Sequence, residues 1–568
     1  MRGDLVRKLT VRCLSAGLAV LSFLVLALAT AKLAGLALAV AGAVAVWVER
    51  RVNPRAGLVA EPVLLIGGVL VGYVHRVPEA RWSWLTLAVT GAALLGLTLA
   101  EKPLRDAAEL EVRAANLGVR SSPLLVADRL GPAVLALLVL LAASAALRLP
   151  AWPVLLLTLL VGAAAAAGAV GPLALRRLRP SARQSAVTQA LRRHQPEFLL
   201  YFSAPPGSEY QVMMWLPYLE RIGRPFVVLL REPDFLGPVS AATRAPVVVC
   251  PTPRSIDEAI VPSLRVAFYV NHGAKNSHCI RFTHLTHIQL HHGDSDKAPS
   301  ANPVSAIFDR IFVAGQAAID RYARNGVTIP AEKFTIVGRP QVEAIEVRRE
   351  PIRDRADKVV LYAPTWTGHN ADVDHCSLPV GETLVRRLLD RGVTVILRAH
   401  PYTSQNPASA RQLARIEQLL AEDRAVSGRP HVFGAEAARK MSLVDCVNAS
   451  DALVSDVSAV ISDYLYSGKP YAITDRVGEG ERFVEGFPLA GSGYVLTSDL
   501  SNLDDVLDRL LDTDPLAETR WRTRTRYLGD FPEQRYADGF LDQARRELDG
   551  AVGAGPTVPS PRPAPAAR

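Results

Sequence analysis

The 568-residue sequence has little cysteine and, in its first third, few acidic side chains. Its five cysteines are scattered and form no CxxC pair: Cys13, Cys250, Cys279, Cys376 and Cys446. This spacing disfavours a disulfide framework and predicts free thiols or small apolar core residues. Hydrophobic residues make up 49% of the chain and charged residues 21%, which excludes a disordered or collagen-like protein.

The positive charge of the chain is confined to its N-terminal third. Residues 1–184 carry 20 Lys/Arg and 9 Asp/Glu, a net charge of +11, whereas the remaining residues carry 44 and 46, a net charge of −2. These basic residues lie between apolar runs. Their distribution therefore indicates membrane topology and argues against nucleic-acid binding.

Six apolar runs precede residue 176: 13–31, 33–48, 57–75, 83–100, 131–147 and 152–175. A membrane span needs about 20 apolar residues, and a signal peptide would supply one such run. With the N-terminus inside, the inner segments hold 16 positive residues and the outer loops four. We predict a multi-pass bundle of about six helices in the cell membrane, with both termini cytoplasmic. Glu61 is either a functional intramembrane carboxylate or an interfacial side chain that reaches water.

The rest of the chain alternates β-branched runs with helical stretches. Strands are predicted at 198–203, 226–230, 246–250, 266–270, 287–290, 309–315 and 333–338, and, after the charged stretch 341–358, at 358–364, 393–399, 452–456 and 470–474. A helix is predicted at 209–222. This alternation predicts two α/β domains with largely parallel sheets, which bind ligands at the carboxyl ends of their strands.

We therefore divide the chain into a membrane domain, two Rossmann-like domains and a disordered Pro/Ala-rich tail. The predicted boundaries are 1–184, 185–345, 346–549 and 550–568.

Four polar motifs directly follow predicted strands. They are His291–Lys297, Tyr362–Trp366, Arg398–Pro401 and Ser455–Tyr464. An imidazole at a strand exit can act as a base near neutral pH, and a guanidinium next to an imidazole suits phosphate oxygens. Hydroxyl groups at a predicted helix start also favour a phosphate.

The motifs resemble those of the CDP-glycerol glycerophosphotransferases, bacterial enzymes that build teichoic-acid-type polyol phosphate polymers of the cell wall. The family pattern runs HG-T-P-x-K, Y-A-P-T-W/F, R-x-H-P, and D-Y-S-S with a following Asp. The matching residues are His292, Gly293, Lys297, Tyr362 to Trp366, Arg398, His400, Pro401, Asp456, Ser458 and Asp463. The resemblance covers roughly residues 196–545 and implies a GT-B fold with the active site between two Rossmann-like domains.

The resemblance also implies the role of each matching residue. His292 would be the general base that takes the proton of an acceptor hydroxyl as it attacks the β-phosphorus of a CDP-polyol. His400 and Arg398 would neutralise the diphosphate as CMP leaves. The remaining matched residues would bind the substrate or nucleotide: Gly293, Lys297, Thr365, Trp366, Asp456, Ser458 and Asp463.

The same resemblance implies the partners and the cofactors. Domain 185–345 would serve the acceptor and domain 346–549 the nucleotide donor. The donor would be CDP-glycerol or a related CDP-polyol, and the acceptor a polyol phosphate or a lipid-linked molecule at the membrane. No cofactor is required; no acidic pair is placed for Mg²⁺, which stays an optional ion.

Departures from the family pattern leave the donor open. Asp294 and Ser295 replace Thr-Pro, adding negative charge beside a diphosphate site, while Val457 and Ala459 replace Tyr and the second Ser. A GT-B glycosyltransferase or capsule-type transferase with another nucleotide donor remains an alternative, as does a non-catalytic nucleotide-binding membrane module.

Two further histidine arrangements also stay open. His272 follows a predicted strand and rivals His292, and His284, His287 and His291 have spacing that could be read as a zinc site.

Overall fold

The computed structural model describes residues 2–53, 59–81, 83–119, 125–178, 182–297, 300–367 and 374–553. The chain divides into two compact units. The first comprises Met1–Ala190 with Val249–Ala259, and the second comprises Leu191–Val248 with Ile260–Arg568.

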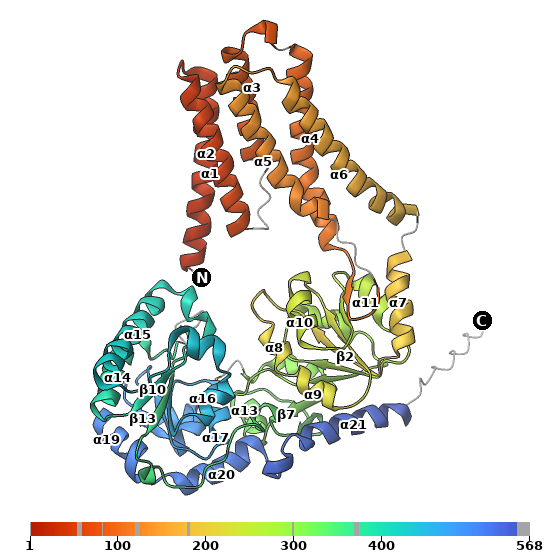
Figure 1. The fold of residues 1–568 in the computed structure, drawn as a ribbon. Helices are drawn as coiled ribbons and strands as arrows, with labels where there is room; N and C mark the ends of the chain where they lie inside the picture. Colours follow the sequence, from red (N-terminus) through yellow and green to blue (C-terminus); the bar gives the residue numbers. More distant parts are fainter. Residues whose placement is uncertain are drawn as a thin grey trace, which may run out of the picture. The chain divides into compact units, whose positions relative to one another are not determined.

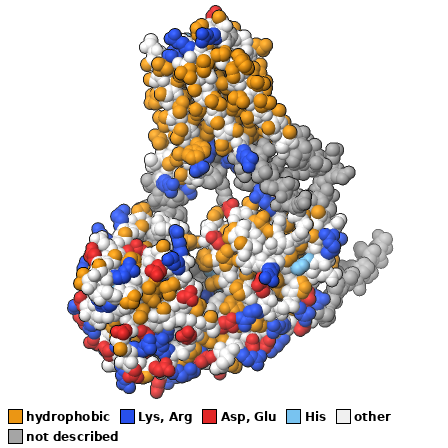
Figure 2. Space-filling model, in the orientation of Figure 1, with side chains coloured by type: hydrophobic (Ala, Val, Ile, Leu, Met, Phe, Trp, Pro, Cys, Tyr) orange, Lys and Arg blue, Asp and Glu red, His pale blue; other side chains and the backbone are white. Residues whose placement is uncertain are grey.

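Long helices dominate the first unit (Figure 1). They are α1 (Arg2–Leu28), α2 (Lys32–Val52), α3 (Ala60–Arg76), α4 (Trp84–Glu109), α5 (Leu125–Ala146) and α6 (Trp152–Leu178). The unit also contains β1 (Arg113–Ala115), α11 (Pro253–Ala259) and α7 (Ala182–His194) as far as Ala190. Hydrophobic side chains cover most of the visible surface of the helical part, as expected for contact with lipid (Figure 2).

Four segments among the described residues are long and apolar enough to cross a membrane. They are Arg7–Leu28, Lys32–Val52, Trp84–Asp106 and Arg129–Ala146. Helix α3 has 17 residues, and α6 contains a shorter apolar segment, Trp152–Gly168. The chain therefore carries four candidate membrane spans near its N-terminus. The count of six spans and the orientation of the termini stay predictions.

A network of ion pairs joins α1, α2 and α3. Glu61 is 4% exposed and lies 3.3 Å from the Arg12 guanidinium, which also contacts Glu49 at 3.1 Å. Glu61 is therefore an ion-paired residue of the helix bundle, and the expectation that it reaches water is wrong.

The first sheet belongs to the second unit and contains β2 (Phe198–Phe202), β3 (Phe226–Leu230), β4 (Val247–Val249), β5 (Val266–Tyr269), β6 (Thr286–Gln289), β7 (Arg310–Val313) and β8 (Phe334–Ile336). These strands lie in the order β4-β3-β2-β5-β6-β7-β8, and the pairs from β3 to β8 are parallel. The central strands are buried on both faces, which explains their continuous apolar sequences.

Short helices connect the strands of the first sheet. They are α8 (Tyr210–Met213), α9 (Leu216–Arg221), α10 (Leu236–Ala242), α12 (Ser277–Ile280) and α13 (Gln316–Arg324). The single helix predicted at 209–222 is therefore two short helices, α8 and α9, separated at Met214 and Trp215.

The second sheet is entirely parallel, with the order β10-β9-β11-β12-β13. Its strands are β9 (Val359–Ala363), β10 (Thr394–Leu397), β11 (Ala452–Ser455), β12 (Tyr471–Thr474) and β13 (Tyr494–Leu496). The helices of this region are α14 (Leu378–Asp390), α15 (Pro407–Ser427), α16 (Leu443–Asn448), α17 (Ala459–Leu465), α18 (Phe483–Gly486) and α19 (Leu503–Asp508).

The last two helices, α20 (Ala517–Leu528) and α21 (Asp538–Gly553), return to the first sheet. The ring of Phe540 in α21 lies 5.1 Å from Trp215, 6.4 Å from Phe268 and 6.3 Å from Phe312. The C-terminal end of the predicted domain 346–549 thus packs against the domain before it. From residue 554 onward, the predicted disordered tail lies outside the described residues.

Candidate active site

The loop after β6 reaches the carboxyl edge of the second sheet. A Cβ atom built on Gly293 would lie 3.6 Å from the Cβ of Ala459, at the start of α17. The Asp296 carboxylate accepts hydrogen bonds from the Leu489 backbone N–H at 3.0 Å and the Tyr527 hydroxyl at 2.7 Å. These contacts hold the loop 291–297 beside the strand ends at which the other three motifs lie.

The His292 ring is held in one tautomer by the backbone. Its Nδ1 lies 2.7 Å from the carbonyl oxygen of Val270. Because a carbonyl can only accept, Nδ1 carries the proton and Nε2 keeps a lone pair. Burial is the main cause that lowers the pKa of His292, and the charge of Arg339 acts in the same direction, against the hydrogen bond to Val270. At neutral pH the His292 ring is therefore uncharged, and its Nε2 can accept a proton.

The His400 ring has the opposite tautomer. Its Nδ1 accepts a hydrogen bond from the Tyr402 backbone N–H at 3.1 Å, so the proton of the neutral ring is on Nε2. Burial first, and then the charge of Lys297, lower the pKa of His400 to about 4. Trp366 lies beside this ring, with centroids 6.0 Å apart. His400 is thus a neutral hydrogen-bond donor within an aromatic cluster.

Lys297 extends from the first sheet towards acidic groups of the second. Burial lowers the pKa of Lys297, while the charges of Asp456 and Asp374 raise it. Its side chain makes no hydrogen bond or ion pair with any residue that the structure describes. An ammonium group in this position can attract an anionic ligand.

Two of the predicted binding carboxylates are engaged by the protein itself. Asp456 is fully buried and accepts hydrogen bonds from the backbone N–H groups of Thr365 at 2.7 Å and Ser377 at 3.1 Å. Asp463 forms a bidentate ion pair with Arg339, with one contact at 3.1 Å. In this structure both carboxylates hold neighbouring segments in place.

Arg398 and Ser458 are likewise directed at protein atoms. The Arg398 guanidinium donates to the carbonyl oxygens of Ala437 and, at 2.7 Å, of Met441. The Ser458 hydroxyl precedes α17 and lies 3.4 Å from that of Ser455. Trp366 is half-buried, and Thr365 is buried. The motif residues therefore gather at one edge, and the two histidine rings and Lys297 have polar atoms that are left for a ligand.

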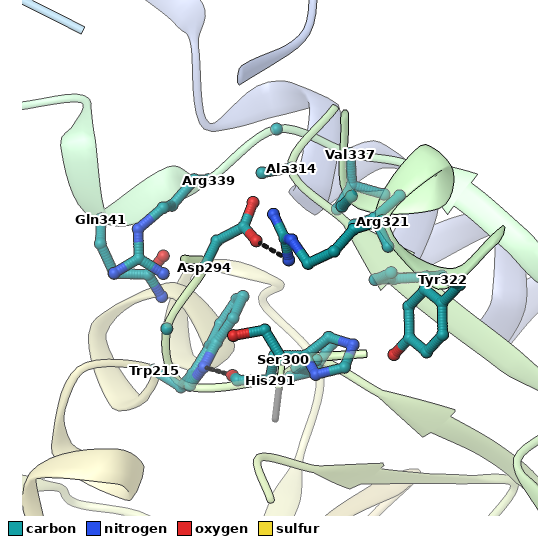
Figure 3. Close-up of a pocket in the computed structure, with 16 residues that line it drawn as sticks. Trp215, His291, Asp294, Ser300, Ala314, Arg321, Tyr322, Val337, Arg339 and Gln341 are labelled. Atoms are coloured by element: carbon teal, nitrogen blue, oxygen red, sulfur yellow. Dashed lines mark hydrogen bonds and ion pairs between the residues drawn. The ribbon is translucent and has the colours of Figure 1, made fainter. Parts of the chain in front are cut away.

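The negative charge of Asp294 is neutralised inside the first domain. Its carboxylate pairs with Arg321 of α13 (Figure 3). Asp296 lies 3.6 Å from the same guanidinium. Asp294, Arg321, His291 and Arg339 line a cavity of about 30 Å³. The replacement of Thr by Asp in the first motif therefore places its charge in this cavity next to an arginine.

His272 and His287, which belong to the two alternative histidine arrangements, form hydrogen bonds with other groups of the protein. His272 Nε2 lies 2.7 Å from the Ser305 hydroxyl, and His287 uses Nδ1 towards Tyr269 at 2.9 Å and Nε2 towards Phe282 O at 3.2 Å. Across the described ranges, no group of three or more His, Cys, Asp or Glu side chains is arranged to hold a metal ion. In the described structure, His284, His287 and His291 therefore do not form a common ligand group.

Sequence reasoning missed Arg339 and His375. Arg339 pairs with Asp463 and acts on His292, and His375 lies in the segment between β9 and α14. Arg339 directly follows the predicted strand 333–338, which could have marked it, whereas His375 follows no predicted strand and belongs to none of the four motifs. Only the folded chain brings them to the site.

Comparisons with known proteins find a family model that matches part of the chain and several similar solved structures. Residues 337–475 match the model of the family described as CDP-Glycerol:Poly(glycerophosphate) glycerophosphotransferase. No curated protein matches the sequence. A variant of the wall teichoic acid polymerase TagF soaked with CDPG is similar at 14% identity and a TM-score of 0.43, over 67% of this chain and 96% of that one.

Two other solved structures are similar over a comparable length. A glycosyltransferase from Rickettsia africae ESF-5 shares 10% identity over 63% of this chain and 100% of that one, with a TM-score of 0.40. A putative UDP-N-acetylglucosamine 2-epimerase from Listeria monocytogenes shares 12% identity over 62% and 97%, with a TM-score of 0.43. The family match confirms the resemblance that the motifs indicate: the chain contains a segment, residues 337–475, that belongs to the CDP-glycerol:poly(glycerophosphate) glycerophosphotransferase family.

Proposed function

We propose that the protein is a membrane-associated transferase that moves a glycerol phosphate unit from CDP-glycerol to a hydroxyl group of a polyol phosphate or lipid-linked acceptor. The family match over residues 337–475 supports the donor class, and the four candidate spans support the association with a membrane. The family match and the candidate spans together support an acceptor that belongs to the cell envelope.

The opposite tautomers of His292 and His400 carry this proposal. His292 has a lone pair on Nε2 because Nδ1 donates to Val270, and His400 has a proton on Nε2 because Nδ1 accepts from Tyr402. A transfer of this kind needs one group that accepts a proton from the nucleophile and one that donates to the phosphate being transferred. The two rings supply these two groups without either being charged.

In the proposed step, the acceptor hydroxyl oxygen attacks the β-phosphorus of CDP-glycerol while its proton passes to His292 Nε2. The bond between the β-phosphorus and the bridging oxygen breaks, and CMP leaves with the electron pair. His400 Nε2–H donates to a phosphate oxygen, and Lys297 provides positive charge near the same group. General-base catalysis of this kind typically contributes about 10²–10⁴-fold.

The test is CMP release from CDP-glycerol by the full-length chain in lipid nanodiscs, with a polyol phosphate acceptor. We expect His292→Ala to lower kcat by about 10²-fold or more, in line with the loss of a general base. His400→Ala should lower kcat/KM as well, because it removes a donor to the phosphate. The exposed His284→Ala is the matched control and should release CMP at the wild-type rate.

Parallel reactions with CDP-ribitol and UDP-sugars identify the donor. The same CMP-release assay with EDTA, with or without added Mg²⁺, measures whether the reaction needs a divalent ion. Release of UMP or UDP from UDP-sugars alone would contradict the proposal. Wild-type turnover by His292→Ala would contradict the role of His292.

A further inference from the structure

A cavity of about 210 Å³ lies at the amino edge of the second sheet. All strands of this sheet are parallel, so their amino ends share one edge. Among the lining residues, Asp451 directly precedes β11, and Lys469 and Pro470 directly precede β12. The three motifs of this sheet lie at the carboxyl ends of its strands. The cavity is therefore separate from the candidate active site.

The lining of this cavity carries more positive than negative charge. Its charged members are five cations and four carboxylates: Arg348, Arg349, Arg353, Arg355 and Lys469, and Glu350, Asp451, Asp512 and Asp514. Two of the carboxylates have cations outside the lining, because Asp514 pairs with Arg520 and Asp512 lies 3.7 Å from Lys358. Two of the cations likewise have carboxylates outside the lining, Glu533 for Arg349 and Asp354 for Arg353. Three cations therefore remain for two carboxylates.

Two guanidinium groups share one buried carboxylate in this cluster. Asp451 is 4% exposed, and one of its oxygens contacts Arg348 and lies 3.3 Å from Nε of Arg355. Its other oxygen accepts a hydrogen bond from the Val359 backbone N–H at 2.9 Å. The Arg355 side chain donates no hydrogen bond to any residue that the structure describes. Its donors are therefore left for a ligand or for water.

Lys469 adds a third positive charge beside these arginines. It is 2% exposed, and its Nζ donates to two backbone carbonyl oxygens at 2.7 and 2.8 Å. Burial first, and then the charge of Arg348, lower the pKa of Lys469 to about 8. The charge of Arg355 acts in the same direction, and those of Asp451 and Glu346 act against it. The ammonium group is still mostly protonated at pH 7, and a bound anion would stabilise it.

Other lining groups suit the hydroxyl groups and carbon atoms of a ligand. The ring of Trp521 lines the cavity, and its Nε1–H donates to no residue in the described ranges. A Cβ atom on Gly468 would lie 2.5 Å from this ring, so a glycine is needed beside it. The Asp512 carboxylate and the Thr513 hydroxyl, which also line the cavity, can accept hydrogen bonds from hydroxyl groups. A bare inorganic anion would use neither the ring face nor these acceptors.

We propose that this cavity is a second binding site, which takes a phosphate ester of a polyol, either free or as one unit of a polyol phosphate chain. Arg348 and Arg355 donate hydrogen bonds to the phosphate oxygens. Hydroxyl groups of the polyol donate to Asp512 and Thr513, and its carbon atoms pack against Trp521. This site goes beyond the proposed function, which concerns only the carboxyl edge of the sheet.

The experiment is the modification of arginine side chains by phenylglyoxal in the full-length chain in detergent, mapped by mass spectrometry. Glycerol 3-phosphate should protect Arg355, whose side chain is 49% exposed, at a lower concentration than inorganic phosphate does. Glycerol alone should not protect it. Arg386 of α14, which is 59% exposed and does not line the cavity, is the control and should react equally throughout.

A glycerol phosphate oligomer distinguishes the two sources of the ester. Protection by the oligomer at a lower concentration than by glycerol 3-phosphate would identify the chain as the ligand. Equal or weaker protection by the oligomer would identify the free ester.

Variants measure the contribution of each part of the lining. The concentration that half-protects Arg353, which also lines the cavity, reports on this site apart from the carboxyl edge. Arg355→Ala should raise this concentration about tenfold or more, the loss expected for a hydrogen bond to a charged group. Asp512→Ala should reduce the preference for glycerol 3-phosphate over inorganic phosphate, because it removes both a hydroxyl acceptor and a negative charge. Arg386→Ala should change neither value.

Equal reactivity of Arg353 and Arg355 with and without glycerol 3-phosphate would overturn the inference. Equal protection by inorganic phosphate would also overturn it, as would protection by CDP alone. The Arg355 side chain makes no hydrogen bond within the described chain, so Arg355→Ala should fold, and thermal melting checks this. If the variant does not fold, the protection of the wild-type chain decides. None of these measurements involves CMP release, so their failure would leave the proposed function standing.

Discussion

At the scale of single residues, one backbone contact to each ring decides what the two matched histidines can do. The Val270 carbonyl leaves His292 with a free lone pair, and the Tyr402 N–H leaves His400 with a free N–H. Both residues are recognisable as motif members in the sequence. Their opposite roles follow only from which backbone group each ring meets.

The protonation of His292 leads to a prediction about pH. Burial and Arg339 lower the pKa of His292 from that of an exposed imidazole, about 6.5. Below its pKa the ring is protonated and cannot accept the hydroxyl proton. We therefore predict that the acid limb of kcat/KM for CMP release lies below pH 6.5, as measured by a pH–rate profile. The residual activity of His292→Ala should lack this limb, and an acid limb above pH 6.5 would contradict the assignment.

The departure at Asp294 also has its explanation at the residue scale. The added carboxylate is buried and paired with Arg321. Arg321 lies far along the chain, so the compensating charge could not be assigned from the motif alone.

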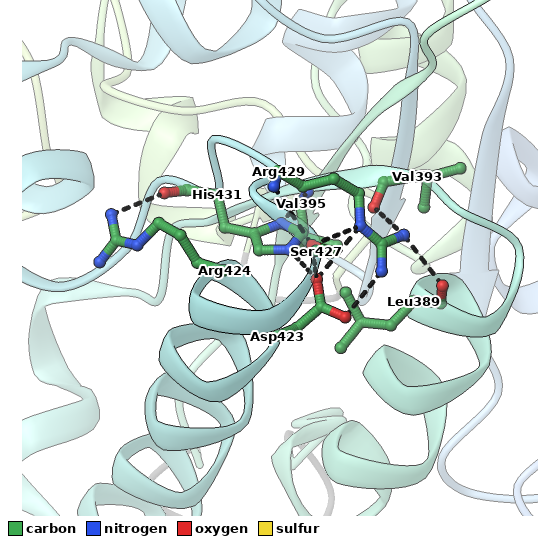
Figure 4. Close-up of polar contacts among 8 residues, drawn as sticks. All are labelled: Leu389, Val393, Val395, Asp423, Arg424, Ser427, Arg429 and His431. Carbon is green, nitrogen blue, oxygen red and sulfur yellow. Dashed lines mark hydrogen bonds and ion pairs between the residues drawn. The ribbon is translucent and has the colours of Figure 1, made fainter.

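At the scale of elements, a polar network closes the edge of the second sheet. The edge strand β10 exposes the Val395 N–H, which donates to His431 Nδ1 at 2.9 Å, and His431 Nε2 in turn donates to Asp423 of α15 at 2.8 Å (Figure 4). Arg429 adds a contact to Asp423 at 2.7 Å and another to the carbonyl oxygen of Leu389 at 2.9 Å. The network links α14, α15 and β10 and, together with the backbone hydrogen bonds between β10 and Val432, protects the outer edge of this strand.

This network leads to a prediction about stability. Burial opposes ionisation of Asp423, but the hydrogen bonds from His431, Ser427 and Arg429 outweigh it and lower the pKa. A carboxylate with a lowered pKa stabilises the fold above its unfolded pKa, about 3.9, and loses this contribution as the pH falls through the folded value. Asp423→Asn should therefore cost about 1–3 kcal/mol at pH 7.

Thermal unfolding of both chains between pH 7 and pH 3 measures this difference, which should shrink at the acid end. Glu422→Gln, an exposed neighbour on α15, is the control and should change little. A difference between wild type and Asp423→Asn that grows as the pH falls would contradict the sign.

At the scale of the whole molecule, the site needs contacts that hold the two sheets together. Tyr527 of α20 donates to Asp296, Arg339 pairs with Asp463, and Phe540 of α21 packs against the first sheet. In the proposed function, the general base His292 follows a strand of the first sheet, and His400, which donates to the phosphate, follows a strand of the second. Catalysis therefore depends on these contacts as much as on the motif residues.

Tyr527→Phe tests this dependence, since it removes one hydroxyl and keeps the ring. We expect kcat/KM for CMP release to fall several-fold, with a loss of stability of about 1.5–3 kcal/mol. Tyr494→Phe is the matched control, because its hydroxyl also binds a carboxylate, Asp514 at 2.8 Å, within the region of the second sheet. It should lower the melting temperature without lowering kcat/KM, and equal losses of kcat/KM in both variants would contradict the role of Tyr527.

Much of the fold and part of the site could be predicted from the sequence. Buried parallel strands are continuous β-branched runs, so β2 and β9 fall within their predicted ranges. The motifs begin in the last residues of the strands expected to precede them, as at Tyr362 in β9 and Ser455 in β11, or just beyond those strands. The helix at 209–222 was not predicted correctly, although Pro217, in the first turn of α9, is a signal for a helix that starts there.

The sequence by itself determined the apolar N-terminal helices, the two parallel sheets and the family of residues 337–475, because periodicity, strand runs and motif spacing are local properties of a chain. The tertiary structure alone decided the tautomers of His292 and His400 and the pairing of Asp463 with Arg339. Each of these depends on atoms from segments far apart in the chain. Proton positions and buried charges are set by such three-dimensional neighbours, and a sequence pattern does not record them.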